Sequence, residues 1–185
     1  VACLPTVVAD DAAGIALPAT DEGLAGAGPI RRYDWFKSLW NERRSAWAKQ
    51  VAQDQNAVVF LGDSITQGWE GEGKDIWEAV YRSRNALNLG IGGDRTQHVI
   101  WRLQNGNLQN QKPKLAILTI GTNNASGKDS PESIAAGNKA IIDELRKQTP
   151  DTKILVLGIF PRGANKDDAA NQINLKVNEI ISKMA

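Results

Sequence analysis

Residues 57–66 read AVVFLGDSIT, and this stretch decides the fold. Its first part, Ala57 to Gly62, is a short apolar run bounded by glycine, which is typical of a strand buried on both faces. Asp63 and Ser64 follow directly, and short polar residues of this kind favour the start of a helix. The stretch therefore predicts a strand of a parallel sheet that turns sharply into a helix.

The same order of strand and helix recurs along the rest of the chain. Further strand-like runs are ALNLGI (Ala86 to Ile91), KLAILTIG (Lys114 to Gly121) and KILVLGIF (Lys153 to Phe160). Helical stretches lie at 75–82, 96–105, 131–148 and 169–184. Regular alternation predicts an α/β fold with a parallel sheet covered on both faces, a three-layer sandwich. Ligands bind beyond the carboxyl ends of such strands, so the residues after each run are the site candidates.

Length and composition exclude several classes of protein. The 185 residues are 42% hydrophobic and 23% charged, as in one globular domain, which we place at residues 31–185. A net charge of +1 with scattered basic residues argues against a nucleic-acid partner. One cysteine, Cys3, and one histidine exclude a disulfide framework and a Cys/His zinc site. No apolar run reaches the ~18 to 20 residues that span a bilayer, so the body is expected to be soluble.

Residues 1–30 and the segment from Trp35 to Val51 differ in composition and in the structure that they predict. Residues 1–30 are rich in Ala, Gly, Asp and Pro and read as a flexible leader. The short side chains of residues 7–9 suggest the remnant of a signal peptide and export to the periplasm or outside, whereas a plain disordered terminus would leave the protein cytoplasmic. A lipidated Cys3 is a further alternative. Trp35 to Val51 shows helical spacing and is expected to pack on the core.

Polar residues or glycines follow the first three strands of the predicted sheet. Ser64 lies at the first turn and is the candidate nucleophile, or else a helix N-cap. Gly92 and Gly93 follow the second strand, where they could bring a bare N–H to a ligand oxygen or form a tight turn; Arg95 stands where a dinucleotide-binding loop needs glycine. Asn123 follows the third strand and offers either a preoriented amide donor or a turn residue.

Taken together, these segments resemble a known family. Gly-Asp-Ser, Gly-Gly-Asp and Gly-Thr-Asn occur in the order and spacing of the first three sequence blocks of the SGNH (GDSL-type) hydrolases. The branch with the catalytic subunits of intracellular platelet-activating-factor acetylhydrolase is similar in further stretches: LNLGIGGD (87–94), VIWRL (99–103), Asn105-Gly106 and LGIFPRG (157–163). The resemblance runs from about Val58 to Val177.

The resemblance implies a flavodoxin-like sandwich that hydrolyses acyl esters without a metal or organic cofactor. It assigns the nucleophile to Ser64, and the oxyanion hole to the Ser64 N–H, the Gly93 N–H and the Asn123 side-chain amide. Asp63 corresponds to a structural aspartate that ties neighbouring loops. Arg95 and Thr122 are expected to support the loops. The substrate is expected to be a small-molecule ester; short acyl esters, acetylated saccharides and lysolipids all stay open, as does the oligomeric state.

One block of the family pattern is absent. In the family, a fifth strand is followed by an Asp and, three residues later, the His that deprotonates the serine, but no Asp-x-x-His occurs in the 185 residues. We expect a fragment of a longer enzyme that lacks the last strand and helix; a base supplied from elsewhere and a pseudo-enzyme are the alternatives. The one histidine, His98, matches a different family position and reads as a capping, packing or substrate-lining residue.

Two expectations depend on this absence. A non-catalytic module of the same fold, which binds an acylated sugar or lipid through Ser64, Gly93 and Asn123, is the alternative to the esterase. The run Lys153 to Phe160 is long and apolar, and it becomes an edge strand where an interior one is expected. Such an edge favours self-association of the chain.

Overall fold

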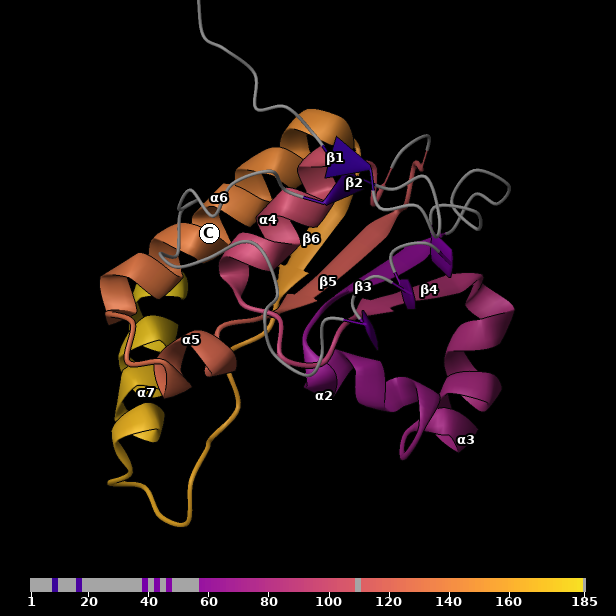
Figure 1. Cartoon of the computed structure of the whole chain (residues 1–185). Helices are drawn as coiled ribbons and strands as arrows, with labels where there is room; N and C mark the ends of the chain where they lie inside the picture. Colours follow the sequence, from indigo (N-terminus) through magenta and orange to yellow (C-terminus); the bar gives the residue numbers. More distant parts are fainter. Residues whose placement is uncertain are drawn as a thin grey trace, which may run out of the picture.

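The computed structural model describes residues 57–108 and 111–184, together with the pairs 8–9, 16–17, 38–39, 42–43 and 46–47. Its centre is a parallel sheet of four strands in the order β4-β3-β5-β6 (Figure 1). The strands are β3 (Val58–Gly62), β4 (Ala86–Gly90), β5 (Leu115–Thr119) and β6 (Lys153–Val156). The predicted α/β fold with a parallel sheet is thereby confirmed.

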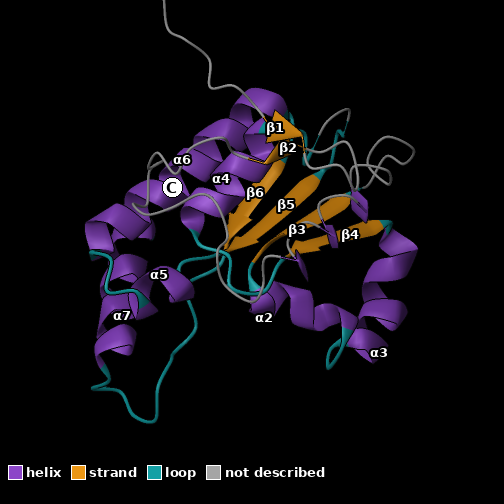
Figure 2. Cartoon of the chain, viewed as in Figure 1, coloured by secondary structure: helices purple, strands orange, loops and turns teal. Residues whose placement is uncertain are grey.

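Helical segments connect the strands, as Figure 2 shows. Between β3 and β4 lie α2 (Ser64–Gln67), the 3-10 turn η1 (Gly68–Glu70), α3 (Lys74–Ile76), the π-helical turn η2 (Trp77–Tyr81) and the 3-10 turn η3 (Arg82–Arg84). The later helices are α4 (Thr96–Gln104), α5 (Thr122–Ser126), α6 (Pro131–Gln148) and α7 (Ala169–Ile181). The short helices α2 and α5, each of which begins within three residues of a strand end, are not individually predicted by the sequence.

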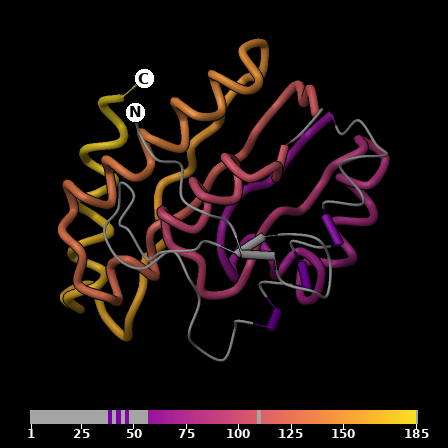
Figure 3. Tube along the Cα trace, turned by 45° about the horizontal axis from the view of Figure 1, so that its top comes forward, coloured from indigo at the N-terminus to yellow at the C-terminus, as the bar shows by residue number. Residues whose placement is uncertain are grey.

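One face of the sheet forms the main core with α4 and α6. Alternate strand residues point to this face, because side chains alternate across a strand. The core residues are fully or almost fully buried: Val59, Leu61, Leu87, Leu89, Ala116 and Leu118 from the sheet, Val99, Ile100 and Leu103 from α4, and Ile141 and Leu145 from α6. A second cluster joins α5, α6 and α7 around Ile134, Ile159 and Val177. Helices α6 and α7 lie side by side in Figure 3 as well.

The opposite face of β3 carries a cluster of aromatic rings. Phe60 is 5% exposed, and its ring lies 5.1 Å from that of Trp77 and 5.0 Å from that of Tyr81 in edge-on geometry. Trp69 of η1 completes the cluster, 6.2 Å from Trp77. Edge-on rings stabilise one another beyond their simple burial. This cluster packs the segment that follows Ser64 against the sheet.

Strand β6 is shorter than the predicted run Lys153 to Phe160, which is a correction. Its backbone leaves the sheet after Leu157, whose N–H still reaches the Leu118 oxygen at 2.9 Å. Beyond this point a side chain of α7 replaces the neighbouring strand as the hydrogen-bond partner of the backbone. Asn178 accepts the Ile159 N–H at 2.7 Å and donates to the Ile159 oxygen at 2.9 Å. Among the described strands β6 does lie at the edge of the sheet.

Most of the N-terminal predictions fall outside the described residues. Within the predicted leader, only β1 (Val8–Ala9) and β2 (Ala16–Leu17) are described; they form a short antiparallel pair that the sequence does not predict. Within the predicted helix at 35–51, the pairs 38–39, 42–43 and 46–47 are helical. Trp47 is 5% exposed and belongs to the main core, which agrees with the packing role expected for this segment.

Candidate active site at the carboxyl ends of the strands

Ser64 is the first residue of α2 and is exposed. Its alternative role as helix cap is taken by Asp63, whose Oδ1 accepts the Ile65 N–H at 3.0 Å. The Ser64 hydroxyl makes no hydrogen bond with the residues that the structure describes. Ser64 therefore presents its side chain to solvent at the carboxyl end of β3, at the N-terminus of a helix.

Asp63 is 1% exposed, and its contacts offset only part of the free-energy cost of burying a charged carboxylate. Desolvation raises the pKa of this carboxyl to about 6, and the neighbouring Asp94 carboxylate adds to the rise. The Ile65 N–H and the Arg162 guanidinium act in the opposite direction. The position next to Ser64 and the contact with α2 fit the structural role expected for Asp63.

The loop after β4 is fixed by backbone hydrogen bonds and by α2. The Ile91 N–H donates to the Gly62 oxygen at 3.2 Å, and the Asp94 N–H donates to the Ile91 oxygen at 3.1 Å. The Gly92 N–H donates to the Oε1 of Gln67 at 2.7 Å. Gly93 has φ of +78°, a backbone conformation that favours glycine. The tight turn considered from the sequence is present, and it lies against the helix that begins with Ser64.

Gly90, at the end of β4, explains how α2 approaches so closely. A Cβ at this position would collide with the backbone of Thr66 and Gln67. Asn88, on the same strand, donates to the Thr66 oxygen at 2.9 Å and accepts the Gly90 N–H at 2.9 Å. Helix α2 is thus attached directly to the neighbouring strand, and Ser64 is held near the glycine loop.

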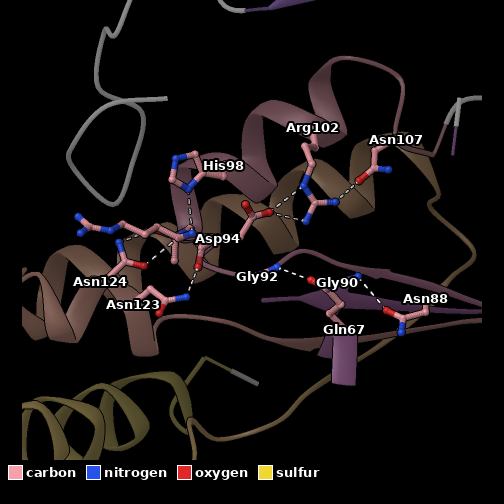
Figure 4. A network of polar contacts seen from close by, with 12 residues as sticks. Gln67, Asn88, Gly90, Gly92, Asp94, His98, Arg102, Asn107, Asn123 and Asn124 are labelled. Carbon is pink, nitrogen blue, oxygen red and sulfur yellow. Dashed lines mark hydrogen bonds and ion pairs between the residues drawn. The ribbon is translucent and has the colours of Figure 1, made fainter. Parts of the chain in front are cut away.

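Asn123 approaches the same loop from α5 (Figure 4). Its Nδ2 donates to the Asp94 oxygen at 2.9 Å, and the residue is half-buried. An asparagine amide has two N–H bonds, so this contact uses one of them and orients the other. The structure therefore joins Asn123 to the residue that follows Gly93, while Gln67 joins the residue before Gly93 to the Ser64 helix.

Asp94 is held by a second set of contacts on its side chain. Its carboxylate is fully buried and accepts a hydrogen bond from Arg102 Nε at 3.0 Å, and Arg102 Nη2 lies 2.9 Å from the same carboxylate oxygen as an ion-pair contact. Arg102, on α4, also donates to Asn107, and its guanidinium lies 5.3 Å from the centre of the Trp47 ring. The ion pair ties the glycine loop to α4. Arg102 stands in the quoted VIWRL motif, but nothing in that motif indicates its partner.

Asn124 is a second residue that the sequence analysis did not select. It is completely buried, and its Oδ1 accepts the Thr96 N–H at 3.1 Å. Its Nδ2 donates to Asp129 at 2.9 Å and to Gln97 at 3.2 Å. Asn124 thereby joins α5 to the start of α4. The sequence signal for Asn124 is its place beside Asn123. Adjacent side chains of a short helix point in different directions, so the two amides contact different parts of the protein.

His98 caps α4. Its Nδ1 accepts the Arg95 N–H at 2.9 Å, the return contact of a capping box, and the side chain is 4% exposed. This geometry agrees with the capping interpretation from the sequence. Arg95 and Thr122, which were expected to support the loops, contact neighbouring segments. Arg95 packs over Gly127, and the Thr122 hydroxyl accepts a hydrogen bond from Arg162 Nη1 at 3.1 Å.

The described part of the chain contains neither a metal-site cluster nor a membrane-spanning helix. Histidine, cysteine, aspartate and glutamate side chains form no group of three or more there that could bind a metal ion. Nor does any helix in this part combine the length and apolar character needed to cross a bilayer.

The sequence matches a family model and several known proteins. Residues 60–185 match the model of the GDSL-like Lipase/Acylhydrolase family. The chain is 38% identical over 142 residues to platelet-activating factor acetylhydrolase IB subunit alpha2 of Homo sapiens, an alignment that covers 77% of this chain and 60% of the human protein. It is 41% identical over 142 residues to subunit alpha1 of Rattus norvegicus, covering 77% and 59%. The chain thus spans less than two thirds of the length of these relatives.

Solved structures share the fold at lower identity. A GDSL-like lipase from Bacteroides thetaiotaomicron has a TM-score of 0.59 at 19% identity, covering 76% of this chain and 72% of the lipase. AlinE4, an esterase of the SGNH-hydrolase family, has a TM-score of 0.54 at 20% identity, covering 71% and 72%. At these identities the likeness shows a common fold.

Proposed function

Because the chain belongs to the GDSL-like lipase/acylhydrolase family, we propose that it is a serine ester hydrolase with Ser64 as nucleophile. One observation carries the proposal: Gln67 accepts the N–H of the residue before Gly93, Asn123 donates to the oxygen of the residue after it, and Gln67 is on the helix that begins with Ser64. The proposed nucleophile and the proposed donors therefore belong to one connected arrangement at the carboxyl ends of adjacent strands. Ligand sites of α/β sheets lie at this edge.

The reaction follows from the properties of these groups. The Ser64 Oγ attacks the ester carbonyl carbon and forms a C–O bond, while its proton passes to a base. The carbonyl oxygen becomes an oxyanion, which the N–H groups of Ser64 and Gly93 and the second N–H of Asn123 stabilise. Collapse breaks the ester C–O bond, the base returns the proton to the departing oxygen so that the alcohol leaves, and water then hydrolyses acyl-Ser64 to the free acid and free Ser64. Each step proceeds without metal or cofactor.

The base is not assigned to His98. Its Nδ1 already accepts the Arg95 N–H, and the ring is buried in the first turn of α4. The proposal for this chain accordingly covers the nucleophile and the oxyanion hole. Acetyl esters are the first substrates to test, since acetylhydrolase is the activity that the names of the curated relatives state.

A second candidate function is a binding module that retains the fold without turnover. It is favoured by the Ser64 hydroxyl, which has no hydrogen-bonded base among the described residues. A free serine hydroxyl is a weak nucleophile near neutral pH. In this alternative the Ser64, Gly93 and Asn123 groups bind the acyl oxygen of an acylated sugar or lipid.

Covalent labelling tests the first proposal on the chain as it exists. A fluorophosphonate reagent should label Ser64, as located by mass spectrometry of peptides, and Ser64→Ala should abolish the label. The matched control, Ser83→Ala, changes another exposed serine and should label normally. Labelling that persists in Ser64→Ala would refute the nucleophile assignment.

Turnover separates the enzyme from the binding module. With p-nitrophenyl acetate, Ser64→Ala should remove all protein-dependent hydrolysis, and Asn123→Ala should lower kcat by about 10² to 10³ with little change in KM. If the unchanged chain binds an acetylated saccharide or lysolipid, and neither it nor a version extended by an Asp-x-x-His segment labels or hydrolyses esters, the binding module is the better description.

A further inference from the structure

We propose that Gln67 is a positioning residue, which fixes the orientation of the peptide unit that carries the Gly93 N–H. This inference deepens the proposed function and rests on it for the catalytic meaning of that N–H. The geometry that supports it is the contact between Gln67 Oε1 and the Gly92 N–H at 2.7 Å (Figure 4).

The peptide unit between Gly92 and Gly93 needs an external restraint. It is flanked by two glycines, and without Cβ atoms on either side its rotation meets little steric resistance. A rotation of this unit would turn the Gly93 N–H away from the oxyanion while leaving the strands in place. A donor contributes fully to catalysis only when it is aimed before the charge develops.

The contacts on both sides of this unit supply the restraint. On the preceding side, the Gly92 N–H is held by Gln67. On the following side, the Asp94 N–H donates to Ile91 and the Asp94 oxygen accepts Asn123. Gln67 supplies a side-chain contact on the preceding side, where the chain comes out of β4.

The location of Gln67 couples the loop to the nucleophile. Gln67 is three residues after Ser64 in the same short helix, and residues at this spacing lie on adjacent turns of one face. Asn88 attaches the helix to β4 by donating to the Thr66 oxygen at 2.9 Å, and the Gln67 N–H closes the first helical turn by donating to the Asp63 oxygen at 2.9 Å. A single helix thus carries both the proposed attacking hydroxyl and the group that orients the donor.

Two substitutions separate the hydrogen bond from the size of the side chain. Gln67→Met keeps the length and the unbranched shape but removes the strong acceptor, whereas Gln67→Glu keeps an acceptor for the Gly92 N–H. The matched control is Gln104→Met, the same change at an exposed position near the end of α4.

The first readout is amide hydrogen exchange of the full chain, measured by NMR. In Gln67→Met, exchange at Gly92 and Gly93 should be roughly three- to tenfold faster, the effect of losing one hydrogen bond. Amides in β4 and α4 should keep their rates. Gln67→Glu and Gln104→Met should retain the protection of the glycine loop.

The second readout is steady-state hydrolysis of p-nitrophenyl acetate. Gln67→Met should lower kcat by about tenfold at unchanged KM, since a misdirected donor affects the transition state more than substrate binding. Unchanged exchange at Gly92 and Gly93, or equal acceleration throughout β4 and α4, would overturn the proposal; so would a rise in KM at constant kcat. If Ser64→Ala shows that the proposed hydrolysis itself is wrong, the exchange rates still decide whether Gln67 fixes the loop.

Discussion

Asp94 and Arg102 form an ion pair with almost no access to solvent, since the two side chains are 0% and 1% exposed. The pair joins the glycine loop to α4, and Arg102 also lies over the ring of Trp47. A buried charge that loses its partner is far more costly than an exposed one. This part of the network should therefore dominate the stability of the loop.

We expect Arg102→Met to lower the free energy of unfolding by about 3 to 5 kcal/mol, because it leaves the Asp94 carboxylate buried without its counter-charge. The double variant Asp94→Asn, Arg102→Met should be less destabilised than the single one. Arg82→Met removes an exposed pair with Glu78 and is the matched control, with an expected change below about 0.5 kcal/mol. Urea unfolding measures all three; a loss below 1 kcal/mol in Arg102→Met would contradict the argument.

Asp63→Asn should stabilise the protein in a pH-dependent manner. The folded-state pKa of about 6 lies above the ordinary 3.8, so the folded protein retains a proton that the unfolded chain has already lost between these values. Stability is consequently lost as pH rises from about 4 to 6, and asparagine removes this loss while keeping Oδ1 for the Ile65 N–H. The gain at pH 8 should reach about 3 kcal/mol and vanish at pH 3. Urea unfolding at both pH values checks it, and an equal gain at both would refute the pKa assignment.

Gly93→Ala should both destabilise the fold and impair the site. Its φ of +78° disfavours any residue with a Cβ, at a cost of about 1 to 2 kcal/mol. Gly106→Ala is the matched control, because Gly106 has φ of +94° in the turn after α4, away from Ser64. Both variants should lose similar stability, but only Gly93→Ala should lower kcat for p-nitrophenyl acetate. An equal fall in kcat would attribute the effect to folding alone.

The two roles considered for His98 predict opposite results. As a cap, it should be replaceable by glutamine, which can make the same return contact, whereas His98→Ala should cost about 1 kcal/mol. Thermal unfolding should show this difference, and hydrolysis per folded molecule should be the same in both variants. If His98→Gln keeps its stability but loses hydrolysis, His98 is the base after all.

The fold could be read from the sequence largely because buried parallel strands are continuous apolar runs. Ala57 to Gly62 and Lys114 to Gly121 both contain the observed strands, and Pro131–Gln148 is helical over its full predicted length. The last strand was predicted too long, because Ile159 and Phe160 look equally suited to a sheet. Side chains on α7 bind their backbone instead, and a pattern read strand by strand does not include partners from a later helix.

For the site, the family resemblance identified Ser64, Gly93 and Asn123, and their catalytic roles remain predictions. Residues that hold those three in place were not identified. Gln67 and Asn124 are amides without a periodic pattern, and Arg102 resembles any other charged helix residue until the fold places Asp94 opposite it. Such residues act through contacts between distant segments, so a single sequence carries little sign of them.

The aromatic cluster beside β3 gives this site a built-in optical signal. The indole rings of Trp69 and Trp77 lie 6.2 Å apart, with planes inclined by 44°. Two identical chromophores this close, neither parallel nor perpendicular, couple their electronic transitions and should produce paired circular dichroism bands of opposite sign. Trp69→Phe should remove the paired bands while leaving the ring cluster filled. The packing of the chain that leads away from Ser64 against Phe60 can therefore be monitored by circular dichroism without any attached label.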